Sequence, residues 1–132
     1  MPTNVSVIHA HEFIRATADG NLDRKEAERL LRDIASASSG LADYEIIIDV
    51  RNAEVKLTTT DLWYLADELL NFYNTFSRRK TAIVASPEGF DREEFFALCA
   101  QNRGFPVMAF TSFEDAFDWL FRADQYVPPQ TD

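Results

Sequence analysis

The stretch Tyr44-Glu45-Ile46-Ile47-Ile48-Asp49-Val50 is a short, nearly continuous run of β-branched residues. Such a run is typical of a strand that is buried on both faces, as strands are in the centre of a parallel sheet. The stretch therefore predicts a central strand, and Asp49 and Arg51 flank its carboxyl end.

Helical and extended patterns alternate on both sides of this strand. One or two strands are predicted within residues 4–17, and further strands at 44–50, 81–85 and 105–110. Helices are predicted from Leu22, capped by Asn21, to about Ser36, then at about 58–77, at about 91–102 and from residue 111 onward. Strands joined through helices imply a mixed or mostly parallel sheet with right-handed crossovers. The fold class is therefore α/β: one domain over residues 1–126, with four or five strands, four helices and a flexible tail at 127–132.

Length and charge exclude several classes of function. A chain of 132 residues, 46% of them hydrophobic, is long enough to bury a core without disulfides or metal. Its 22 acidic and 13 basic residues give a net charge of −9, which disfavours nucleic acids and anionic membranes as partners. The single cysteine, Cys99, excludes an internal disulfide and a multi-cysteine zinc site. We expect a cytoplasmic protein without a metal or another cofactor.

Three strings resemble the STAS-type, SpoIIAA-like domains, which are relatives of bacterial anti-sigma factor antagonists. They are Ile46-Ile47-Ile48-Asp49-Val50-Arg51, Thr81-Ala82-Ile83-Val84, and Gly104 to Phe110 followed by Phe113-Glu114-Asp115-Ala116-Phe117-Asp118-Trp119-Leu120. The resemblance implies a small non-enzymatic domain that binds a protein partner through the loop and helix after the central strand. In the antagonists that helix starts with an Asp-Ser-Ser-Gly string that carries a phosphorylated hydroxyl. The matching stretch here, Leu57-Thr58-Thr59-Thr60-Asp61, keeps hydroxyls but lacks the leading Asp and the Gly.

Two groups of residues at the carboxyl end of the central strand are candidates for a partner-binding or regulatory site. Thr58, Thr59, Thr60 and Asp61 lie at a predicted helix N-terminus, where unpaired N–H groups would stabilise a phosphate. The alternative is that Thr58 and Asp61 form a capping box. Asp49 and Arg51 are the second group, and they either recognise a polar group of a partner or satisfy the loop itself.

A second hypothesis comes from the aromatic residues of the predicted helix at 58–77. An apolar ligand groove would use Trp63, Phe72, Tyr73 and Phe76, although these residues equally suit core packing. The leading function is thus a non-catalytic regulatory or protein-interaction module with an unidentified protein partner, and a homodimer is left open. The alternative is a sensor or carrier of an apolar small molecule. No nucleophile elbow, phosphate loop or dinucleotide fingerprint is present, and no enzymatic activity is predicted.

Overall fold

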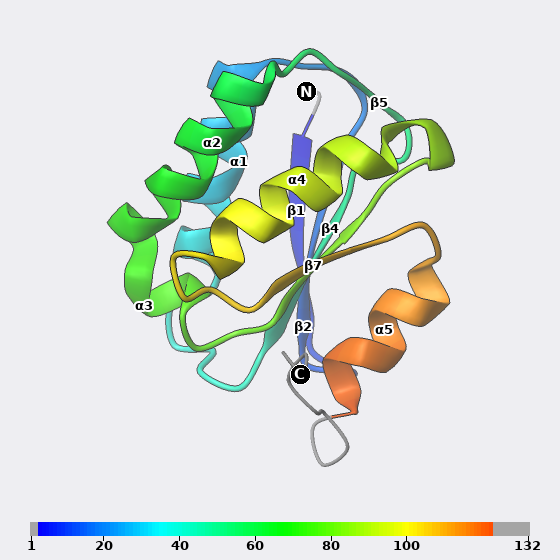
Figure 1. The fold of residues 1–132 in the computed structure, drawn as a ribbon. Helices are drawn as coiled ribbons and strands as arrows, with labels where there is room; N and C mark the ends of the chain where they lie inside the picture. The colour runs from blue at the N-terminus through cyan, green and yellow to red at the C-terminus, as the bar shows by residue number, and fades with distance from the viewer. Residues whose placement is uncertain (1–2, 123–132) are drawn as a thin grey trace, which may run out of the picture.

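The computed structural model describes residues 3–122, which form a five-stranded sheet with helices on both faces (Figure 1). The strand order is β1-β2-β4-β6-β7, in which β1 is antiparallel to β2 and the remaining neighbours are parallel. The strands are β1 (Thr3–Ile8), β2 (Phe13–Ala18), β4 (Glu45–Asp49), β6 (Thr81–Val84) and β7 (Val107–Phe110). The predicted α/β class and mostly parallel sheet are confirmed.

Helices α1 (Arg24–Ala37), α2 (Thr59–Glu68) and α4 (Phe90–Gln101) form most of the cover on one face of the sheet, and α5 (Phe113–Phe121) covers the other. In Figure 1, α1, α2 and α4 lie together, and α5 lies apart from them. Ile46 and Ile48 belong to the large core beneath the three helices, whereas Ile47 packs in a smaller core beneath α5. Because successive side chains of a strand alternate between faces, this central strand needs apolar residues at consecutive positions.

A second, two-stranded sheet was missed by the sequence prediction. It pairs β3 (Gly20–Leu22) with β5 (Ala53–Val55) in parallel, in two segments where no strand was predicted. Strands of three residues are too short to show a hydrophobic period. Leu22 belongs to β3, so the first helix begins at Arg24 rather than at Leu22. The cap of this helix is Asp23 rather than Asn21, and the Asp23 Oδ1 accepts a hydrogen bond from the Glu26 N–H at 2.9 Å.

The long helix predicted at 58–77 is interrupted. After α2, residues Leu69–Phe72 form a 3₁₀ turn, and α3 (Tyr73–Phe76) adds one more helical turn. Phe72 has φ −125° and ψ 41°, which ends the regular helix at that residue. The apolar spacing of Leu69, Phe72 and Phe76 remains helical across the break, so the sequence pattern could not reveal it. The last strand also begins at Val107 rather than at residue 105, and the predicted tail at 127–132 lies outside the described residues.

Candidate functional site

Asp49 and Arg51 form a closely bonded pair at the carboxyl end of β4. The Asp49 Oδ1 accepts hydrogen bonds from the Arg51 backbone N–H at 3.1 Å and from Nε at 3.0 Å, and Oδ2 accepts one from Nη2 at 2.7 Å. The side chain of Asp49 is 8% exposed, whereas that of Arg51 is 41% exposed. The buried carboxylate thus fixes the orientation of a guanidinium that remains open to solvent.

The electrostatics of this pair follow from burial opposed by hydrogen bonding. Burial alone would raise the pKa of Asp49, but the hydrogen bonds from Arg51 and the positive charges of Arg51 and Arg15 hold that pKa below its ordinary value. The hydrogen bond with Asp49 correspondingly raises the pKa of Arg51. Both groups are therefore charged at neutral pH.

A polar surface hollow of about 200 Å³ adjoins the pair. It is lined by residues of β2, of the turn that follows β2, and of the loop after β4: Arg15, Thr17, Ala18, Asp19, Asp49 and Asn52. Thr17 lies opposite Asp49 in the parallel ladder between β2 and β4. Arg15, Thr17, Asp19 and Asn52 were not among the predicted site residues. For Arg15 and Thr17, the available signal was the alternation of β2, in which they are interleaved with the buried Ile14, Ala16 and Ala18.

At the start of α2, Thr58 and Asp61 form the capping box that was one of the two interpretations of this segment. The Thr58 Oγ1 accepts a hydrogen bond from the Asp61 N–H at 3.1 Å, and the Asp61 Oδ2 accepts one from the Thr58 N–H at 3.0 Å. Arg24 of α1 lies 3.9 Å from Asp61. Thr59 and Thr60 are exposed and make no capping bond. Two of the four residues are thus committed to stabilising the helix end.

The structure separates the two groups of the predicted partner-binding site. Asp49 shares the α5 face of the sheet with Ile47, whereas α2 packs over the opposite face through Leu62 and Leu65. A partner would have to wrap over the end of the sheet to contact both groups. Each group is therefore a separate surface of the molecule.

The four aromatic residues of the alternative groove are dispersed. Phe76 is completely buried, and Phe72 packs against the main core. Trp63 and Tyr73 are 46% and 56% exposed, and the Arg103 guanidinium lies 4.6 Å from the centre of the Trp63 ring. The structure does not bring these four side chains together around one space.

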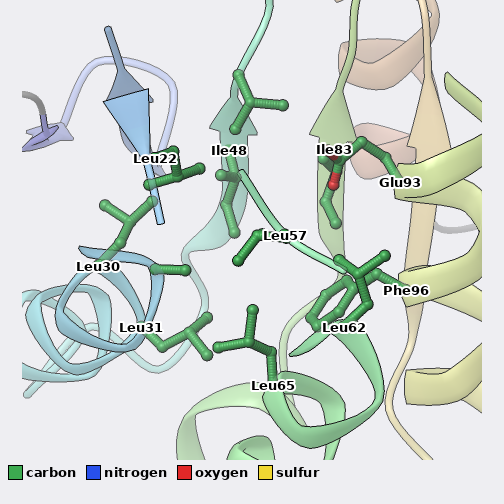
Figure 2. A pocket seen from close by; sticks show the side chains of 12 residues that line it. Leu22, Leu30, Leu31, Ile48, Leu57, Leu62, Leu65, Ile83, Glu93 and Phe96 are labelled. Atoms are coloured by element: carbon green, nitrogen blue, oxygen red, sulfur yellow. The ribbon is translucent and has the colours of Figure 1, made fainter. Parts of the chain in front are cut away.

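An apolar cavity lies instead between the sheet and helices α1, α2 and α4 (Figure 2). Its volume is about 50 Å³, and Leu62 and Leu65 are the α2 residues that line it. Leu30 and Leu31 of α1, Ile48 of β4 and the loop residue Leu57 close other sides, as Figure 2 shows. An apolar cavity that binds benzene has a volume of about 150 Å³, so a molecule of that size does not fit here without movement of the walls.

One ionisable side chain, Glu93 of α4, borders this cavity. The side chain is 8% exposed, and its Oε2 lies 3.4 Å from the Nε of the neighbouring Arg92. Burial raises the pKa of Glu93, and the nearby charge and hydrogen bond of Arg92 oppose that shift only in part. The sequence pattern does not distinguish Glu93, because it stands in the charged run Asp91-Arg92-Glu93-Glu94, whose other members are exposed or half-buried.

Comparison with known proteins identifies the fold. No family model and no curated protein matches the sequence. One solved structure with a similar fold is that of an uncharacterized protein of the DUF3478 family with a SpoIIAA-like fold, from Shewanella loihica PV-4. It superposes with a TM-score of 0.61 and 20% sequence identity, over 89% of this chain and 93% of that one. This chain has a SpoIIAA-like fold.

The SpoIIAA-like fold places the candidate residues at one end of the sheet. The Asp49–Arg51 pair, the polar hollow and the capped start of α2 all follow the carboxyl ends of parallel strands, where ligands of open α/β sheets bind. Among residues 3–122, no group of three metal-ligating side chains could hold a metal ion. No helix in this part of the chain is long and apolar enough to cross a membrane.

Proposed function

We propose that this chain is a non-catalytic regulatory module that binds a protein partner at the carboxyl ends of β2 and β4. The observation that carries the proposal is the Arg51 guanidinium, which two hydrogen bonds to the Asp49 carboxylate hold in place while 41% of the Arg51 side chain remains exposed. Ordering a long side chain is one of the costs of association, and here the fold has already ordered it. Folds of the SpoIIAA-like type are generally non-enzymatic modules, which supports this class of function.

The partner group that suits this surface is a carboxylate. Both oxygens of Asp49 already accept hydrogen bonds from Arg51, and the Nη1 of Arg51 has no acceptor among the described residues. Arg15, on the neighbouring strand β2, adds a second exposed guanidinium and lines the polar hollow together with Asp49. Guanidinium groups bind carboxylates through paired, charge-assisted hydrogen bonds. Asp19 also lines the hollow, which favours a partner that places its carboxylate beside Arg15 and away from Asp19.

The exposed hydroxyls of Thr59 and Thr60 offer a second contact or a site of regulation. They lie in the first turn of α2, where a phosphate would meet the positive end of the helix dipole. The carrier hypothesis is less well supported, because the observed cavity has a volume of only about 50 Å³ and does not adjoin Trp63, Phe72, Tyr73 or Phe76.

The proposal is tested by affinity capture from a lysate, with bound proteins identified by mass spectrometry. The baits are the wild-type chain, Arg51→Ala, Thr59→Asp and Arg32→Ala. Arg32 is an exposed arginine of α1 without an ion-pair partner in the described chain, so it controls for simple loss of one positive charge. A protein retained by wild type and Arg32→Ala but lost with Arg51→Ala supports the proposed surface. Equal capture by all four baits rejects it.

A further inference from the structure

The strand β1 forms an edge of the main sheet, and no other strand of residues 3–122 pairs with its outer side. Natural proteins protect such edges with charged residues, proline, bulges or a covering segment. The six residues of β1, Thr3–Ile8, contain no charged residue, no proline and no glycine. The opposite edge, β7, has four residues, and the Gln101 side chain covers part of it by donating a hydrogen bond to the Val107 carbonyl at 2.7 Å.

The ladder geometry shows which residues of β1 direct their backbone groups outward. The Glu45 N–H donates a hydrogen bond to the Glu12 carbonyl. The even-numbered residues of β2 therefore direct their backbone N–H and C=O groups toward β4, and the odd-numbered residues direct theirs toward β1. The β1 residues opposite Phe13, Arg15 and Thr17 are Ile8, Ser6 and Asn4. The alternate residues Thr3, Val5 and Val7 therefore direct their N–H and C=O groups away from the sheet. No hydrogen bond to these outward groups occurs within residues 3–122.

The sequence of β1 is self-complementary. In Thr3-Asn4-Val5-Ser6-Val7, β-branched residues alternate with small polar ones symmetrically about Val5. A second copy running antiparallel places Val5 opposite Val5, Thr3 opposite Val7, and Asn4 opposite Ser6. All three β-branched residues lie on the face that α1 covers, since Val5 and Val7 pair with the buried Ala16 and Ile14. Such cross-strand pairs are the unit of sheet stabilisation.

Charge also favours a second copy at this edge. A chain of net charge −9 repels its own copies over most of its surface. The strand β1 itself is uncharged, and the helix that packs on it, α1, is nearly balanced. The charged residues of α1 are Arg24, Lys25, Arg29 and Arg32 against Glu26, Glu28 and Asp33.

We propose that two copies of this chain associate through β1, antiparallel about Val5, and join their five-stranded sheets into one continuous sheet. The interface is isologous, because each copy contributes the same strand, and it closes after two copies. It uses a different surface from the Asp49–Arg51 pair, so it stands independently of the proposed function.

The oligomeric state of charge variants tests this interface. Light scattering and sedimentation measure the mass of four samples: wild type, Val5→Lys, Val5→Glu, and an equimolar mixture of the two variants. Each sample is measured at about 100 µM, roughly a hundredfold above a micromolar Kd. Wild type should have twice the monomer mass of 15.1 kDa, and each variant alone should have the monomer mass. The mixture should regain the dimer mass, because opposite charges then face each other at the dyad. Ala109→Lys, on the other edge strand, should remain dimeric.

Amide exchange of the wild-type chain provides a test that needs no variant. In the proposed dimer the Val5 and Val7 amides are protected, and their exchange accelerates on dilution, whereas the Asn4 and Ser6 amides are protected at every concentration. A monomeric wild type at about 100 µM, a dimer that persists in Val5→Lys, or Val5 protection that does not depend on concentration overturns the proposal. If the variants fail to fold, as circular dichroism would show, the exchange result alone decides.

Discussion

Substitution of Val50 by isoleucine should stabilise the protein, because Val50 borders the apolar cavity. The cavity has a volume of about 50 Å³, and unfilled volume in a core costs about 24 cal/mol per Å³. Leaving this space empty therefore costs roughly 1.2 kcal/mol, which is the upper limit of what better packing can recover. One added methylene occupies only part of the space, so we expect a gain of about 0.5 to 1 kcal/mol in the free energy of unfolding.

The same added methylene at a packed position should have the opposite effect. Val84 of β6 is completely buried in the small core beneath α5 and does not line the cavity. Val84→Ile is therefore expected to cost about 1 to 3 kcal/mol by overpacking. The two variants make the identical chemical change, so the difference in their effects reports on the local space alone.

Urea denaturation followed by circular dichroism measures both effects. Val50→Ile should move the midpoint to higher urea at an unchanged m-value, and thermal melting should show a rise of about 2 to 4 °C. A loss of stability in Val50→Ile similar to that of Val84→Ile would show that the space beside Val50 is already filled, by protein atoms or by a bound molecule. That result would refute the cavity reasoning.

Three further predictions concern capping and charge. Thr58→Ala removes the Oγ1 acceptor of the capping box and should cost about 1 kcal/mol, whereas Thr60→Ala should change the urea midpoint by less than about half as much. Glu93→Gln should stabilise the protein at pH 7. The raised pKa of Glu93 means that the folded state disfavours the charged carboxylate. This penalty is absent at pH values below the ordinary pKa of 4.5 and grows as the pH rises through the folded pKa. Urea midpoints at pH 4 and pH 7 check this, and an equal change at both would contradict it. Asp49→Asn should destabilise the protein at pH 7. The lowered pKa of Asp49 contributes stability at pH values above the ordinary pKa of 3.8, and this stability is lost as the pH falls through the folded pKa. The difference in urea midpoint from wild type should therefore shrink on acidification.

Local patterns in the sequence were sufficient to predict the main sheet but not the site. The isoleucine run at Ile46, Ile47 and Ile48 predicts a strand with two covered faces, and both cores are present. The Asp49–Arg51 contact was also within reach, because residues two apart in an extended segment point the same way. The hollow beside them could not be predicted, since that requires knowing that Thr17 pairs with Asp49, 32 positions further along the chain. Register between distant strands is a tertiary property that no single segment encodes.

The exposure of the polar hollow follows from the path of one helix across the sheet. The α5 residue Phe117 packs edge-on against Phe13 at the amino end of β2, with ring centres 5.6 Å apart, and Phe121 lies 6.2 Å from the same ring. Because α5 starts just after the carboxyl end of β7 and finishes beside Phe13, it does not cover the carboxyl end of β2. Arg15 and Thr17 lie two and four positions after Phe13 and therefore on the same face of β2, and both are accordingly polar. The single helix on this side therefore leaves the guanidinium groups of Arg51 and Arg15 exposed, next to the buried Asp49 carboxylate.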